Sequence, residues 1–229
     1  MRQGGDTVSH LPTSGLGPGV PGIPAAAAGD MIAQFLNSPE ARARRATREQ
    51  ARAVRRDAAL LEYGSEDAVW RPSAAESALE AACRPLIVRK PIRGGEIVTL
   101  MGWDGGRFRH MPAEVCEAVA AACPVPTSVR EAWREHGQFE KRREDRRAFF
   151  EDYDEDAWVK ARVAFLEHLL DSLPAGSLND VRARMDWMRH LNEIELNRGN
   201  PEDAELLATL NADIERMGAL IRAMAAERG

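Results

Sequence analysis

The sequence is poor in aromatic residues and cysteine, and it has no long hydrophobic run. Aromatic side chains make up 6% of the 229 residues, and the three cysteines, Cys83, Cys116 and Cys123, form no CxxC pair. No stretch approaches the roughly 18 consecutive apolar residues that a membrane-spanning helix needs. An odd number of cysteines without an export signal indicates reduced thiols. We therefore expect a soluble, cytoplasmic protein with no membrane association.

Motifs that carry chemistry are also missing. The histidines occur at no HExxH spacing, no serine lies in a GxSxG setting, and the glycines in the middle of the chain precede no GK[ST]. The acidic run Glu151–Asp156 lacks the glycine and the spaced glutamate of an EF-hand. We therefore expect no enzymatic activity, no cofactor and no metal site. The alternative is a cysteine–histidine site formed by Cys116, Cys123 and either His110 or His136.

The composition favours packed helices. Apolar residues make up 44% of the chain, with abundant alanine and few aromatic rings. We predict a mainly α protein in four parts: a disordered arm over residues 1–30, an Arg-rich helix over 31–63, a small α+β region over 64–126, and a helical region over 127–229 that ends in an antiparallel helix hairpin. The Gly- and Pro-rich arm buries too little apolar surface to offset the entropy of ordering.

The middle of the chain holds the β-like stretch. Leu86–Ile92 and Glu96–Trp103 are apolar and β-branched, and each is followed by a glycine-containing turn. Arg107–Met111 is a third short run. We predict a three-stranded antiparallel meander in which Trp103 and Phe108 cover one face.

Three serines mark helix starts. Ser73, Ser128 and Ser177 are each followed three residues later by an acidic residue, and the first two match the capping-box pattern. The basic block Glu140–Arg147 follows the second start, and we expect a solvated helix with ion pairs one turn apart. The acidic run Glu151–Asp156 then suits the start of the next helix.

The chain ends in two amphipathic segments. Apolar residues recur at steps of three and four, as on one face of a helix. Between the segments, Gly199, Asn200 and Pro201 suit the end of one helix and the start of the next. We predict a helix hairpin that self-associates or binds another protein, as a coiled coil does. Its first seam is Leu178, Val181, Met185, Met188 and Leu191, and its second, the predicted interaction seam, is Leu207, Leu210, Ile214, Met217, Ile221 and Met224.

Pro39–Tyr63 is helical by propensity and carries unbalanced positive charge. Two interpretations are open. The arginines pair with the acidic C-terminal half, or they contact phosphates, which would make the chain a nucleic-acid-binding accessory protein. The net charge of −5 weakens the second interpretation. The arginines are Arg42, Arg44, Arg45, Arg48, Arg52, Arg55 and Arg56.

The segment Leu173-Pro-Ala-Gly-Ser-Leu-Asn-Asp-Val-Arg-Ala-Arg-Met185 joins a Pro-Ala-small-Ser-Leu helix start to a short basic helix. This pattern resembles that of uncharacterised helical proteins from prophage-like regions of GC-rich bacterial genomes. The resemblance implies an accessory protein of a phage or mobile element, and it brings no known activity and no functional residue. Together with the C-terminal hairpin, it favours a non-enzymatic helical interaction or assembly protein.

Overall fold

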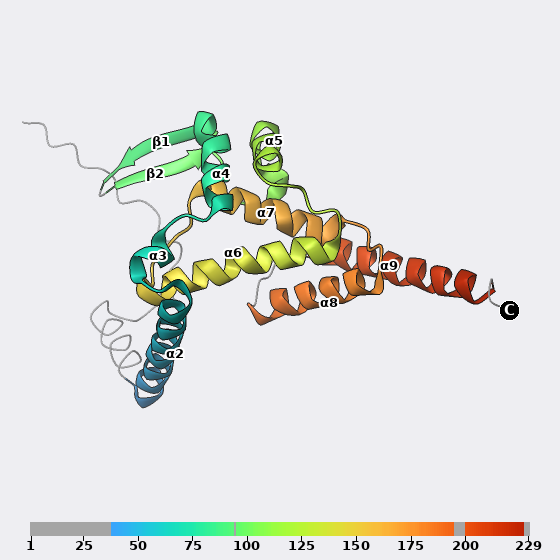
Figure 1. Ribbon diagram of the computed structural model, residues 1–229, viewed down its shortest axis with the longest axis horizontal. Coiled ribbons are helices and arrows are strands. Elements are labelled where there is room, and N and C mark those ends of the chain that lie inside the picture. The colour runs from blue at the N-terminus through green and yellow to red at the C-terminus, as the bar shows by residue number, and fades with distance from the viewer. Residues whose placement is uncertain (1–37, 94, 195–199, 227–229) are drawn as a thin grey trace, which may run out of the picture. The chain divides into compact units, whose positions relative to one another are not determined.

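The computed structural model describes residues 38–93, 95–194 and 200–226, and Figure 1 shows how they are arranged. The predicted arm over residues 1–30 and the predicted turn residue Gly199 lie outside them. The chain divides into two units, residues 1–51 and residues 52–229. In the first unit, the described residues form the beginning of one long helix, α2 (Pro39–Tyr63).

The protein is mainly helical, with a two-stranded antiparallel sheet in the middle of the chain, as the composition predicted. Within the described residues, no helix is both long and apolar enough to cross a membrane. After α2 the elements are α3 (Glu66–Trp70), α4 (Ala74–Cys83), β1 (Ile87–Ile92), β2 (Gly95–Leu100), α5 (Ala113–Ala122), α6 (Val129–Phe149), α7 (Ala157–Ser172), α8 (Leu178–Glu193) and α9 (Asn200–Ala226).

The sheet has two strands where three were predicted. β1 and β2 pair along their whole length, with Ile87 opposite Leu100. The expected third strand is instead a single 3-10 turn, Phe108–His110. The Phe108 ring packs edge-on against Phe165 of α7, with 5.8 Å between ring centroids. This contact with a helix takes the place of pairing with β2.

α7 is the central helix of the second unit. The four successive residues 161–164 are buried, so α7 is covered on all sides in its middle turn. It contacts α4 and α5 as well as α6, α8 and α9, and Figure 1 shows α6 running beside it. Leu166 and Leu170 of α7 share one hydrophobic cluster with Leu79 of α4 and Trp187 of α8. The core of the unit is therefore built around this helix.

The three predicted helix starts are confirmed. Each serine side chain accepts a hydrogen bond from the backbone N–H three residues further on. Ser73 and Glu76 form a complete capping box at α4. At α6, Ser128 caps the helix, but the Glu131 carboxylate accepts from the backbone N–H of Thr127 instead of closing the box.

The basic block of α6 forms the predicted ion pairs one turn apart, as between Lys141 and Asp145, but part of it is an internal contact and not the solvated face that was predicted. Arg146 is 6% exposed, and its Nη1 lies 2.6 Å from Oε1 of Glu76. Arg142 adds a second ion pair to Glu76 at 2.9 Å. Burial by itself would raise the pKa of Glu76, but hydrogen bonds from Arg146 and from the backbone of Ser73 hold that pKa below its usual value. The carboxylate that caps α4 thus also binds α4 to α6.

The acidic residues between α6 and α7 lie in contrasting surroundings. Asp152 is exposed, whereas the side chain of Glu155 is 9% exposed. Burial raises the pKa of Glu155 from 4.5 to about 7, with Arg143 opposing the change and Glu140 adding to it. The folded protein therefore retains this proton over a pH range in which the unfolded chain has lost it. Because of that difference, Glu155 makes the protein less stable as the pH rises from 4.5 to about 7.

Replacing Glu155 by glutamine should remove this pH dependence. We expect Glu155→Gln to raise the free energy of unfolding at about pH 8 by about 1–3 kcal/mol, because no buried carboxyl group then has to ionise. Near pH 5 the gain should be almost absent. Urea denaturation followed by circular dichroism measures both values. Asp152→Asn is the exposed control and should change stability by less than about 0.5 kcal/mol; an equal gain for Glu155→Gln at both pH values would contradict the assignment.

Candidate interaction surface on the C-terminal helix

The first part of α9 packs on α7 and α8. Leu206, Asp213 and Met217 lie on its inner side and are 3%, 0% and 6% exposed. Met217 packs against Ala175 in the turn between α7 and α8, and against Val181 of α8. The inner face of α9 therefore combines apolar contacts with one fully buried carboxylate.

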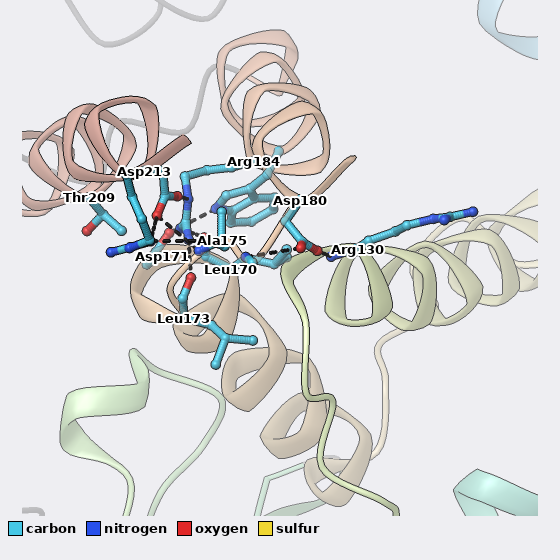
Figure 2. Close-up of polar contacts among 12 residues, drawn as sticks. Arg130, Leu170, Asp171, Leu173, Ala175, Asp180, Arg184, Thr209 and Asp213 are labelled. Atoms are coloured by element: carbon cyan, nitrogen blue, oxygen red, sulfur yellow. Dashed lines mark hydrogen bonds and ion pairs between the residues drawn. The ribbon is translucent and has the colours of Figure 1, made fainter. Parts of the chain in front are cut away.

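That carboxylate forms an ion pair closed to solvent. Nε of Arg184, on α8, lies 2.9 Å from Oδ2 of Asp213, and both side chains are 0% exposed (Figure 2). The other guanidinium nitrogens of Arg184 donate to the backbone carbonyls of Leu170 and Leu173. Oδ1 of Asp213 accepts from the backbone N–H of Ala175 at 3.0 Å. Because each polar atom of the pair has a partner, the two charges can remain buried.

A second carboxylate holds the same turn. Asp180 accepts hydrogen bonds from the hydroxyl of Ser177 and from the backbone N–H of Gly176. It also accepts one from the backbone N–H of Arg130 (Figure 2). Burial would raise the pKa of Asp180, but these hydrogen bonds hold it below its usual value. Since Arg130 lies in the first turn of α6, the turn between α7 and α8 is joined to α6 by Asp180 and to α9 by Asp213.

The outer side of α9 is apolar and exposed. Leu207, Ile214 and Ile221 follow one another at seven-residue steps and are 49%, 53% and 55% exposed. Seven residues are close to two helical turns, so the three side chains lie in one line along the helix. We call these three residues the α9 stripe. Leu220 and Met224 are 51% and 48% exposed and lie beyond Met217, the last buried residue of α9. Figure 1 shows the C-terminal part of α9 projecting past α8.

The structure divides the predicted interaction seam of α9 between two faces. Met217 is buried, and Leu210 is partly buried in the same small cluster. These two residues attach α9 to its own chain. The other four members of the predicted seam are exposed, and they are Leu207, Ile214, Ile221 and Met224.

α8 is rotated with respect to its predicted seam. Val181 and Leu191 are buried, but Leu178 and Met185 are 55% and 50% exposed. Arg184 takes an inner position that the apolar pattern could not indicate, because a buried arginine and a surface arginine look the same in a sequence. Its acidic partner is equally unmarked, and only the packing of α9 on α8 brings the two together.

The arginines of α2 lie in different surroundings. Arg52 pairs with Glu151 at 2.5 Å, and Arg55 pairs with Asp145 at 3.1 Å. The predicted pairing with acidic residues is thus observed for these two, both of which belong to the second unit. The remaining five are exposed, and they are Arg42, Arg44, Arg45, Arg48 and Arg56.

The side chains suited to metal or thiol chemistry are dispersed. Across residues 38–93, 95–194 and 200–226, no group of three His, Cys, Asp or Glu side chains could hold a metal ion. Cys83 and Cys123 are buried and Cys116 is half-buried, and none of them forms a disulfide. Burial raises the pKa of all three thiols, which makes them less reactive at neutral pH.

A groove of about 1160 Å³ lies against α6. Tyr63 and Phe139 contribute aromatic lining, and Glu62 and Lys141 contribute charge. Nζ of Lys141 lies 2.8 Å from carboxylate oxygens of both Glu62 and Asp145. The Lys141 amine in this groove is therefore already paired with two carboxylates.

Comparison of the chain with models of known protein families, with curated protein sequences and with solved structures finds no match. The α9 stripe is the strongest candidate for an interaction site on the described surface. It presents regularly spaced apolar residues on a helix that is held in place by the buried Arg184–Asp213 ion pair. How strongly this ion pair holds α9 can be measured.

Removing the Asp213 carboxylate should release α9. Asp213→Ala leaves the Arg184 guanidinium buried without its partner, so we expect a loss of about 3–5 kcal/mol in the free energy that holds α9 on α8. Amide hydrogen exchange of residues 206–217 and urea denaturation measure this loss. The control is Asp186→Ala, which removes an exposed ion pair with Arg189 in α8 and should cost less than about 1 kcal/mol. Equal exchange rates in the two variants would show that the buried pair does not anchor the helix.

Proposed function

We propose that this chain is a non-enzymatic helical interaction protein that binds another helix through the α9 stripe. The observation that carries the proposal is the line of half-exposed residues Leu207, Ile214 and Ile221 on a helix that is already fixed on its inner side.

The regular spacing of the stripe supports this role. A single exposed leucine or isoleucine is ordinary on a protein surface. Three of them at seven-residue steps form a seam of the kind that coiled coils bury. Covering the exposed half of each side chain would contribute roughly 1–2 kcal/mol. A second helix of similar length could cover all three at once.

The buried anchor supports it as well. An isolated helix must pay the entropy of ordering when it binds. α9 is ordered in advance, because Asp213 and Met217 attach its first part to α8 and to the turn before α8. A helix ordered in this way presents its stripe without that further cost.

The alternative, a nucleic-acid-binding accessory protein that uses Arg42–Arg56, has less support. Arg52 and Arg55 face Glu151 and Asp145. Contact with a phosphate would have to compete with carboxylates at both positions.

Placing charge on the stripe should abolish complex formation. We expect the tagged chain, expressed in its native cells, to run in cell extract as a complex larger than one copy. The variant Ile214→Glu/Ile221→Glu should run at the size of one copy, because binding would bury two carboxylates. The matched control is Ala212→Glu/Ala219→Glu, which adds the same charge on the opposite, exposed side of α9 and should keep the complex. A complex of unchanged size in the stripe variant would refute the proposal.

A further inference from the structure

A smaller residue follows each member of the α9 stripe on the same line of the helix. Each of these smaller residues follows its stripe residue by four positions, so large and smaller residues alternate along one line of the helix. Two of the smaller residues are exposed and the third, a glycine, is half-buried. In order along the helix, the line is Leu207, Asn211, Ile214, Gly218, Ile221 and Ala225.

We propose that the α9 stripe binds the α9 stripe of a second copy of this chain, with the two helices antiparallel and related by a two-fold axis at the level of residue 216. This inference rests on the proposed function and names the partner. In this pairing each layer contains one large and one small side chain from opposite copies. The layers are Leu207 opposite Ala225, Ile214 opposite Gly218, and Ile221 opposite Asn211, and the symmetry repeats each of them.

The size pattern favours the antiparallel arrangement over the parallel one. In a parallel in-register pair, Ile214 would meet Ile214 and Gly218 would meet Gly218. Large pairs would then hold the helices apart while small pairs left gaps, and unfilled gaps lose dispersion contacts. In the antiparallel pair every layer combines one large side chain with a smaller residue, so the layers differ less in size than in the parallel pair and the two helices can stay at a more even distance along the stripe.

A close approach by Ile214 of the second copy accounts for the glycine at position 218. Glycine in the middle of a helix is unfavourable compared with alanine. Within the described residues, the atom nearest to a Cβ added at position 218 is Nη1 of Arg222, the end of a flexible side chain, at 3.4 Å. The packing of the chain on itself therefore does not require a glycine here. Ile214 of a second copy would use the space.

The charges beside the stripe are self-complementary. Glu215 and Arg222 are exposed along the edge of the stripe that faces away from the buried side of α9. A two-fold axis across antiparallel helices brings this edge of one copy beside the same edge of the other. Arg222 of each copy then lies about 7.5 Å along the helix axis from Glu215 of the other copy, which two long side chains can span.

The pair would also bury apolar side chains in the projecting C-terminal part of α9. The antiparallel arrangement places Leu220 and Met224 of one copy beside the docked part of α9 in the other, on the side where α8 packs. Leu178 and Met185 lie one turn before and after Val181 on α8, which touches Met217, and both are half exposed. These residues enlarge the apolar surface available to the second copy.

The apolar area that the two copies can bury indicates how tightly they bind. Pairing would remove on the order of 400 Å² of apolar surface from water on each copy, about half of what a standard stable interface buries per partner. The side chains that supply this area are Leu207, Ile214, Leu220, Ile221 and Met224. We therefore expect a reversible dimer with a dissociation constant on the order of micromolar.

Sedimentation velocity of the purified full-length chain tests the size and affinity of the pair. We expect the mass to double across the micromolar range. Gly218→Leu should weaken the dimer about tenfold or more, since the added side chain meets Ile214 of the other copy, while the fold persists because position 218 faces only the end of Arg222 within its own chain. Ala212→Leu, on the opposite side of α9, should leave the dimer unchanged. A monomer at every concentration, or a Gly218→Leu dimer as tight as the original, would overturn the inference.

Disulfide trapping tests the direction of the pair. An equal mixture of the Leu207→Cys chain and a tagged Ala225→Cys chain should form the mixed disulfide on mild oxidation, and the unmodified chain gives the background from Cys83, Cys116 and Cys123. Disulfides only between identical chains would show a parallel pair and overturn the proposal. If the purified chain stays monomeric while the complex in cell extract still depends on Ile214 and Ile221, the second copy is the wrong partner and the proposed function stands.

Discussion

The ion pair between Arg184 and Asp213 is the constraint on which the position of α9 depends. Its two charges are fully buried, and burial is tolerable because Leu170, Leu173 and Ala175 supply backbone partners and Arg216 adds a second ion pair to Asp213. Any rotation or sliding of α9 on α8 would separate the buried Arg184 guanidinium from its carboxylate, which costs several kcal/mol. The apolar contacts of Leu206 and Met217 would tolerate such a shift more easily, because they have no directional requirement. The polar contact thus decides which side of α9 faces inwards and which side remains exposed.

Carboxylates at helix junctions recur in this protein. Glu76 closes the cap of α4 and receives two arginines of α6, while Asp180 links the turn before α8 to the first turn of α6. In both cases hydrogen bonds outweigh the effect of burial and hold the pKa of the carboxyl group below its ordinary value, and at Glu76 the charges of Arg146 and Arg142 add to this effect. Glu155 shows the opposite balance, since its partner Arg143 is 3.8 Å away and burial prevails. The distance and number of hydrogen-bond donors decide between the two outcomes.

The two sides of α9 therefore differ in character. The inner side is specific and polar at its centre, while the outer side is apolar, regular and half exposed. A helix that is fixed on one side and apolar on the other suits reversible association, because its ordering does not depend on the partner. In the proposed dimer, the alternation of large and smaller residues adds a preference for direction that apolar character alone would not provide.

The amino-acid sequence by itself determined the helical class, the three serine-capped starts and the two amphipathic C-terminal segments. These features depend on contacts within one or two turns, which residue spacing records directly. Tertiary structure decided the rest. Phe108 packs on α7 and so ends the sheet at two strands, and Arg146 turns inwards because Glu76 lies across from it. The predicted seam of α9 is shared between an inner and an outer face because Asp213 finds Arg184 on another helix. Pairs so distant in the chain leave no periodic trace, since a charged residue has the same appearance in a sequence whether it meets water or a buried partner.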